Sequence, residues 1–161
     1  MVQNSGRRAA RDGRTAPLDD TDQQIVAALR EDGRLSMRAL AERLHISRAN
    51  VYTRVERLER ERVITGYTAT VDPQRCGLGI AAYIYVKINQ HSWKAVRQRI
   101  LALPAVEHGS LVSGDHDLVL LVRTTDNSTL RDLVLTELQA IPEVLATRTE
   151  LIFDELARDR S

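Results

Sequence analysis

The stretch Ser36–Arg60, SMRALAERLHISRANVYTRVERLER, decides how the first half of this chain folds. It contains two short segments whose apolar residues recur at helical spacing. Ser36 and Ser47 each precede one segment, where a serine oxygen can accept a hydrogen bond from a first-turn backbone N–H. His45-Ile46 leaves room only for a tight break between them. Two short helices joined by such a turn predict a helix-turn-helix, whose second helix typically enters the major groove of DNA.

The flanking sequence extends this unit to residues 18–71, a predicted winged helix-turn-helix domain. Leu18, Ile25 and Leu29 recur at heptad-like spacing and predict a preceding helix that ends at Gly33. Acidic residues at its start, Asp19, Asp20 and Asp22, suit the positive end of a helix dipole. After the second helix of the motif, the segment from Val63 to Val71 predicts a short wing or a strand that leads onward.

Three segments look like tails or connections. Residues 1–17 carry four arginines and no large apolar residue after Val2, which predicts a disordered basic tail. Such a tail is either simply solvated or adds nonspecific contacts to DNA phosphates. The proline- and glycine-containing segment 72–79 is the predicted linker, and residues 155–161 form a C-terminal tail.

The remaining residues, 80–154, alternate between strand and helix patterns. Strands are predicted at Ile80 to Ile88, Val106 to Ser113, Asp117 to Arg123 and Val144 to Phe153. One helix should follow a Ser92 cap, with Trp93, Val96 and Ile100 inward, and another should open at Asp126 to Ser128. The order βαββαβ predicts an α+β, ferredoxin-like domain in which two helices cover one face of an antiparallel sheet.

Two features of this domain point to contacts with other molecules. Gly114-Asp115 predicts a tight two-residue hairpin turn, because glycine supplies the positive φ that such a turn needs. The uncovered sheet face would carry either Tyr83 and Tyr85 or the alternating set Ala82, Ile84 and Val86. Either set exposes more apolar surface than a monomer usually tolerates, which predicts a homodimer formed sheet to sheet.

Composition excludes several classes. The 161 residues, 43% apolar and 28% charged, suit compact globular domains. Cys76 is the only cysteine, so neither an intramolecular disulfide nor a cysteine metal cluster can form. No apolar run reaches the roughly 18 residues of a membrane span, and Met1 to Pro17 lacks a signal-like apolar stretch. We therefore expect a cytoplasmic, nucleoid-associated protein without membrane contact, metal or cofactor.

Several stretches together resemble the Lrp/AsnC family of leucine-responsive, feast/famine transcription regulators. The matching stretches are Leu18-Asp19-Asp20-Thr21-Asp22, Gly33-Arg34-Leu35-Ser36 with Leu40-Ala41, Arg54-Val55 with Arg57-Leu58-Glu59, Val63-Ile64 before Gly66-Tyr67, and Gly114-Asp115-His116-Asp117. The resemblance spans roughly residues 18–153. It implies a winged helix-turn-helix joined to a ferredoxin-like ligand-sensing domain, dimers that assemble into tetramers or octamers, and amino-acid effectors. His116 departs from the aromatic residue frequent in relatives, so the identity of the effector stays open.

The candidate DNA-binding residues lie mainly on the second helix of the motif. Arg48 and Asn50 are the expected base readers, because arginine can bridge guanine O6 and N7 and asparagine can pair with adenine N6 and N7. Tyr52 and Arg54 are expected to contact the DNA backbone. Arg57 is ambiguous, since neighbouring glutamates could pair with it on the helix surface. The complete predicted set is Ser36, Ser47, Arg48, Asn50, Val51, Tyr52, Arg54 and Arg57.

The candidate effector site surrounds the predicted hairpin. Turn N–H groups could bind the carboxylate of an amino acid, Asp115 or Asp117 its ammonium group, and apolar neighbours its side chain. The alternative is a purely structural hairpin. The complete predicted set is Leu111, Gly114, Asp115, His116, Asp117 and Leu118.

The same residues also allow other functions to be imagined. Asp115, His116 and Asp117 could form a metal or acid-base cluster, and with His108, Ser110 and Ser113 a hydrolase triad can be imagined. Consecutive strand residues point to opposite faces, so these groups do not converge, and we predict no enzyme activity. The main alternative is an architectural protein that compacts DNA without a ligand. A further alternative is an enzyme tethered to DNA, but the sequence contains no glycine-rich phosphate loop. A pure oligomerisation module is another, but it would not need the helix-turn-helix.

Overall fold

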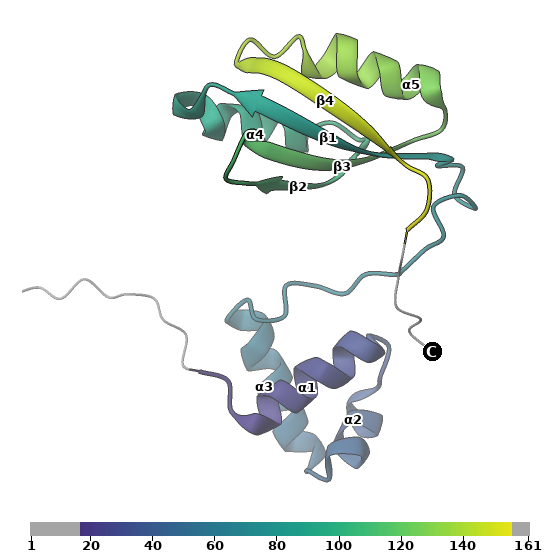
Figure 1. Cartoon of the computed structure of the whole chain (residues 1–161). Coiled ribbons are helices and arrows are strands. Elements are labelled where there is room, and N and C mark those ends of the chain that lie inside the picture. The colour runs from purple at the N-terminus through teal and green to yellow at the C-terminus, as the bar shows by residue number, and fades with distance from the viewer. Residues whose placement is uncertain (1–16, 156–161) are drawn as a thin grey trace, which may run out of the picture. The chain divides into compact units, whose positions relative to one another are not determined.

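The computed structural model describes residues 17–155, which form two compact units that divide between Ala69 and Thr70. The first unit is built from helices and the second from a sheet with its helices (Figure 1). Each unit has its own apolar core. The basic tail predicted for residues 1–17 lies outside the described residues except for Pro17, as does most of the predicted C-terminal tail. No helix in the described part of the chain is long and apolar enough to cross a membrane.

The first unit consists of α1 (Asp20–Glu31), α2 (Met37–Leu44) and α3 (Arg48–Arg60), as the sequence predicts. Ser36 Oγ accepts a hydrogen bond from the Ala39 N–H at 3.1 Å, and Ser47 Oγ accepts one from the Asn50 N–H at 3.2 Å. Each serine satisfies a donor that the helix itself cannot pair. His45 between α2 and α3 adopts the left-handed conformation, with φ 55°, and so makes the tight turn possible.

The three helices pack around a small aliphatic core. Its buried members come from every helix: Ile25, Ala28, Leu29, Leu40, Ala41, Val51, Val55 and Leu58. Burying one such leucine, isoleucine or valine side chain contributes about 1.5–3 kcal/mol. The periodic apolar residues of α3 are therefore committed to holding it against α1 and α2.

A buried carboxylate also joins α3 to α1. Asp22 is 1% exposed, and its Oδ1 accepts a hydrogen bond from Arg54 Nη1 at 2.7 Å while its Oδ2 pairs with Arg57. Arg54 Nη1 also donates to Asp19 Oδ2 at 2.7 Å, and Asp19 caps α1 through the Asp22 N–H. Chiefly through its hydrogen bond, Arg54 holds the pKa of Asp19 below its ordinary value of 3.8. This pair is therefore ionised at neutral pH, and its stabilisation is lost only as the pH falls through the lowered pKa.

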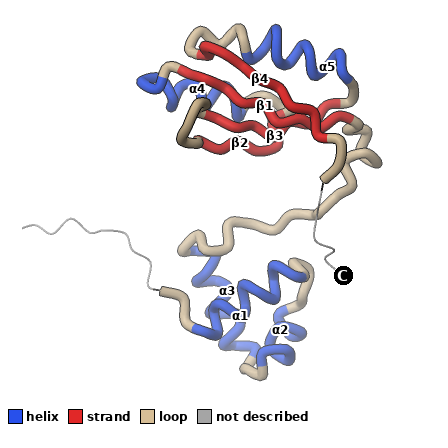
Figure 2. Tube along the Cα trace, in the orientation of Figure 1, coloured by secondary structure: helices blue, strands red, loops and turns tan. Residues whose placement is uncertain are grey.

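The second unit is a four-stranded antiparallel sheet with helices on one face (Figure 2). The strands β1 (Ile80–Ile88), β2 (Val106–Leu111), β3 (Leu118–Thr124) and β4 (Val144–Ile152) lie in the order β2-β3-β1-β4. The helical elements are α4 (Trp93–Leu101), which a short 3₁₀ turn η1 (Gln90–Ser92) precedes, α5 (Asn127–Asp132) and the π-helical continuation η2 (Leu133–Leu138). This is the predicted ferredoxin-like arrangement.

Strand register assigns the two faces of the sheet. Ala82, Ile84 and Val86 are fully buried against the helices, so the uncovered face carries the alternative set, Tyr83 and Tyr85. Val119 and Leu121 of β3 pair with Tyr85 and Tyr83 and lie half-buried on the same face. The uncovered face is thus partly apolar, with Tyr83 41% exposed.

Four local predictions are wrong. No strand forms within Val63 to Val71 in the described chain, because the Val63 and Ile64 N–H groups donate to Leu58 O at the end of α3 and no partner strand lies beside the rest. Ser92 makes no side-chain cap bond, since it is the last residue of the 3₁₀ turn η1 and lacks the extended backbone of a capping serine. Trp93 is 36% exposed rather than a core residue. The β2–β3 turn is longer than two residues, since Val112 N–H donates to Asp117 O, although Gly114 does take a positive φ of 126°.

Replacing Asp22 by asparagine should destabilise the first unit, because two arginines then lose a buried counter-charge. We expect the free energy of unfolding to fall by about 2–4 kcal/mol. This is somewhat less than the usual cost of breaking a fully buried pair, because Arg54 and Arg57 are partly exposed. Asp20→Asn is the matched control, since Asp20 lies in the same first turn but is exposed. Urea unfolding measures both, and equal small losses would refute the structural role of Asp22.

Candidate DNA-binding and effector sites

The first two turns of α3 present an exposed polar surface. Arg48, Asn50 and Tyr52 are all exposed, and Tyr52 keeps 55% of its surface accessible. Within the described residues, the guanidinium of Arg48 has neither an ion-pair nor a hydrogen-bond partner. A free guanidinium, an amide and a phenol at the N-terminal end of a second helix can contact base edges and phosphates.

The other predicted DNA-binding residues have structural positions. Val51 is fully buried in the core, so its side chain cannot reach DNA without unfolding α3. Ser36 and Ser47 are helix caps. Arg54 and Arg57 bind the carboxylates of α1, and Arg57 pairs with Asp22 rather than with the nearby glutamates. Arg54 additionally donates from Nε to Asn50 Oδ1 at 2.8 Å.

Asp22 is the residue that the sequence analysis missed. Its helix-starting position suggested a dipole role only, but Asp19 and Asp22 form a capping box, which orients both carboxylates at the start of α1. The spacing of Arg54 and Arg57, one turn apart on the same helix, was the available signal that both arginines share one partner. Hydrogen bonds to the carboxylates of Asp19 and Asp22 raise the pKa of Arg54, so this side chain stays positively charged.

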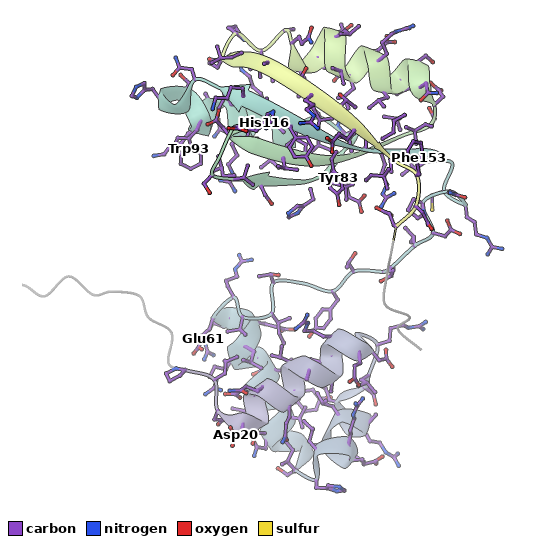
Figure 3. All side chains as sticks on the ribbon, viewed as in Figure 1. Asp20, Glu61, Tyr83, Trp93, His116 and Phe153 are labelled. Carbon is purple, nitrogen blue, oxygen red and sulfur yellow. The ribbon has the colours of Figure 1, made fainter. Side chains whose placement is uncertain are left out.

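The predicted effector region lies at the end of the sheet where β1 ends and the β2–β3 loop begins. A hollow of about 340 Å³ there is lined by Ile88, Trp93, Leu111, Val112 and Asp117. Figure 3 labels Trp93, which is the first residue of α4. Four of these five residues are apolar, and the fifth brings a carboxylate. The hollow therefore combines a hydrophobic wall with one negative group.

Asp117 is held firmly at this hollow. It is 6% exposed, its Oδ2 accepts a hydrogen bond from the Ile88 N–H at 2.9 Å, and the same oxygen lies 3.6 Å from Lys87 Nζ. Its own N–H donates to Val86 O. The carboxylate thus ties the end of β1 to the start of β3 and has a structural role whatever it binds.

The six predicted effector residues do not all converge. Leu111 and Asp117 line the hollow, whereas Gly114 and Asp115 are exposed in the adjoining loop. Leu118 is a core residue. The His116 ring lies against Tyr85 of the uncovered face, with ring centroids 5.3 Å apart and the planes tilted by 51°, and Arg148 lies over the same tyrosine ring. His116 and Asp117, which precede β3 in the loop, thus contact different groups: His116 reaches Tyr85 of the uncovered face, and Asp117 lines the hollow.

The structure brings together one pair from the imagined hydrolase triad. His108 Nε2 lies 3.1 Å from Ser110 Oγ on β2, where His108 is exposed and Ser110 is half-buried. Within the described residues, no carboxylate hydrogen-bonds to His108, so the third member that orients a catalytic histidine is not in place. Nor do the described residues contain a group of three or more histidine, cysteine or acidic side chains placed to hold a metal.

Comparison with protein families divides the chain in the same two parts. Residues 18–65 match the family model described as winged helix-turn-helix DNA-binding, and residues 81–161 match the Lrp/AsnC ligand binding domain. The second model alone covers half of the chain. The fold predicted from the sequence is thereby confirmed in both parts.

Individual relatives agree with the family models. The chain is 35% identical to the HTH-type transcriptional regulator AldR of Mycolicibacterium smegmatis, over 96% of this chain and 91% of that protein. The feast or famine regulatory protein of M. tuberculosis, complexed with L-methionine, superposes with a TM-score of 0.82 at 31% identity, covering 90% of this chain and 98% of that one. A transcriptional regulator of Neisseria meningitidis in complex with L-methionine gives a TM-score of 0.81 at 26% identity, covering 88% and 94%. The chain belongs to the Lrp/AsnC family of transcriptional regulators.

Proposed function

We propose that this protein binds specific sites in double-stranded DNA through α3 and that a small effector, an amino acid, modulates its assembly and DNA affinity. The observation that carries the DNA-binding part is the exposed set Arg48, Asn50 and Tyr52 at the start of a helix whose apolar residues are buried in the core. Arg48 and Asn50 read bases, while Tyr52 contacts the backbone. A regulator of this kind acts on the genome, in the cytoplasm and at the nucleoid.

The effector part is supported by the hollow beside Trp93 and Asp117. Two similar solved structures, from M. tuberculosis and Neisseria meningitidis, contain L-methionine. A volume of about 340 Å³ lies within the range of small-molecule sites. An amino acid bound here would lay its side chain against Trp93 and Leu111, with its ammonium group near Asp117 or Asp115. Of the predicted residues, Gly114 would supply backbone groups from the loop, and the proposal assigns Leu118 and His116 no direct contact.

Assembly is the proposed link between the two sites. A homodimer formed through the uncovered sheet face would cover Tyr83, and further association would give tetramers or octamers. Two-fold symmetry then presents two α3 helices to a nearly palindromic DNA site. An effector shifts DNA binding only through its differential affinity for two assembly states, typically by about 1–3 kcal/mol.

The alternative function is architectural compaction of DNA without any ligand. It keeps the same DNA-binding helix but needs no occupant of the hollow. The proposed absence of enzyme activity rests on the relatives, which are named as transcriptional regulators.

Replacing Arg48 or Asn50 by alanine should cost about 1–3 kcal/mol on the preferred DNA site and clearly less on random DNA, because base contacts carry the sequence preference. Gel shifts over a salt series measure both affinities, and wild-type log affinity should fall by roughly 0.9 per neutralised phosphate for each unit of log salt. Arg131→Ala, in an exposed pair of the second unit, is the control. Equal losses on both DNAs would show that neither residue reads bases.

Asp117→Asn should weaken L-methionine binding at least about tenfold if its charge receives the ammonium group, since ionic hydrogen bonds are the stronger kind. The amide keeps an oxygen that can accept from the Ile88 N–H, so the fold should be retained. Asp115→Asn is the paired variant, because the same argument applies if the loop carboxylate is used instead. Calorimetric titration reports affinity. Unchanged binding in both variants would place the effector elsewhere, and no amino-acid binding by wild type would favour the architectural alternative.

Tyr83→Arg should break the proposed dimer, because it sets a charge at the centre of the uncovered face, and a second copy places the same charge opposite. Sedimentation velocity at micromolar concentration should show a dimer or larger species for wild type and a smaller species for the variant. Lys94→Glu, on the helix-covered side, should sediment like the wild type. A monomeric wild type would contradict the assembly proposal directly.

A further inference from the structure

We propose that Arg54, anchored by the carboxylates of Asp19 and Asp22, is a positioning residue that fixes the side-chain amide of Asn50 and thereby sets the base preference of α3. This inference rests on the proposed function, because it assumes that Asn50 faces the DNA bases. It assigns to Arg54 a role other than the phosphate contact expected from the sequence.

The geometry begins in α1. Arg54 Nη1 donates to Asp19 Oδ2 and to Asp22 Oδ1, both at 2.7 Å, and the arginine side chain is only 22% exposed. Both carboxylates belong to the capping box at the start of α1, where their own backbone bonds orient them. The guanidinium is planar, so fixing Nη1 from two sides also fixes the direction of its Nε–H.

That Nε–H donates to Asn50 Oδ1 at 2.8 Å, one helical turn toward the exposed end of α3. A guanidinium has donors only, so it accepts no hydrogen bond from the amide NH₂ group. If the amide turned over, two donors would face each other and the bond would be lost. Arg54 therefore selects one of the two amide orientations, the one with Oδ1 held and Nδ2 directed away.

Amide orientation decides what Asn50 can read. Pairing with adenine requires an oxygen that accepts from N6 and an NH₂ group that donates to N7. An overturned amide exchanges donor and acceptor and matches a different base edge. An amide locked in one orientation before binding also avoids the cost of ordering it in the complex. Arg54 can thus influence specificity without touching DNA.

The ion pairs also remove Arg54 as a phosphate contact. Its charge is balanced by two carboxylates, and breaking these bonds to reach a phosphate would leave Asp22, 1% exposed, without one of its two ion-pair partners. Arg48, by contrast, has no such partner among the described residues. The two arginines at this end of α3 therefore have different roles. Arg48 contacts DNA, whereas Arg54 orients Asn50, which contacts DNA.

The test is a double-mutant cycle on base discrimination. A preferred DNA site is first selected in vitro with wild-type protein, and affinities are then measured for that site, for each single base-pair variant of it and for random DNA. The proteins are wild type, Arg54→Lys, Asn50→Ala and the double variant. Lysine keeps the charge near Asp19 and Asp22 but has no rigid fork that also holds Asn50. Arg131→Lys is the matched control.

Arg54→Lys should reduce discrimination at one base pair from about 10-fold to about twofold or less, the scale of losing one good amide–base pair. Random-DNA affinity should change less than about twofold and the salt slope should not change. In the Asn50→Ala background, the same substitution should change nothing at that base pair. A loss of affinity by a similar factor on all DNAs, random DNA included, would identify a contact to the DNA backbone and overturn the proposal.

A second variant protects the test from a folding defect. Asp19→Ser retains an N-cap oxygen and leaves Asp22 in place, but it removes one of the two anchors of Arg54. It should lower discrimination at the same base pair by a smaller factor, and only when Asn50 is present. Unchanged discrimination in both Arg54→Lys and Asp19→Ser, with a selective wild type, would refute this inference alone. A wild type that selects no sequence would instead refute the proposed function on which it rests.

Discussion

The pairing of one buried carboxylate, Asp22, with Arg54 and Arg57 is the interaction on which the first unit depends. The aliphatic core alone would leave α3 free to rotate slightly about its axis, because apolar contacts carry little directional information. Charge-assisted hydrogen bonds between α1 and α3 are directional and fix that rotation. The ion pairs inside the first unit therefore help to set which residues of α3 face outward and at what angle.

A comparable constraint shapes the second unit. Asp117 joins the backbone of β1 to the start of β3, and this ties the β2–β3 loop to the sheet at one end. Just before β3, His116 contacts Tyr85 of the uncovered face, while Asp117 lines the hollow beside Trp93. One short loop consequently contributes to the surface proposed for assembly and to the hollow proposed for the effector. Their proximity gives a physical route for one to influence the other.

The sequence was sufficient for the elements and insufficient for the contacts between them. Ser36 and Ser47 predicted both helix starts, and strand alternation predicted β1 with its exact ends, because these depend on local chemistry. The exposed positions of Arg48 and Asn50 in the first turns of α3 followed from helical periodicity. The partners of Arg54 and Arg57 did not, since they lie more than thirty residues away and pairing at that distance is set by packing. The same limit applied to Val63 to Val71, where the residues favoured a strand but no neighbouring strand was available to pair.

The division of α3 into inward and outward residues has an evolutionary consequence. Val51, Val55 and Leu58 hold the helix in place, and Arg54 and Arg57 are bound to α1, whereas Arg48, Ala49, Asn50, Tyr52 and Thr53 are exposed. Substitutions at the exposed positions leave the core and the ion pairs intact, so they carry little penalty in stability. After gene duplication, copies of such a regulator could acquire new target sequences through a handful of codons while inheriting the scaffold unchanged.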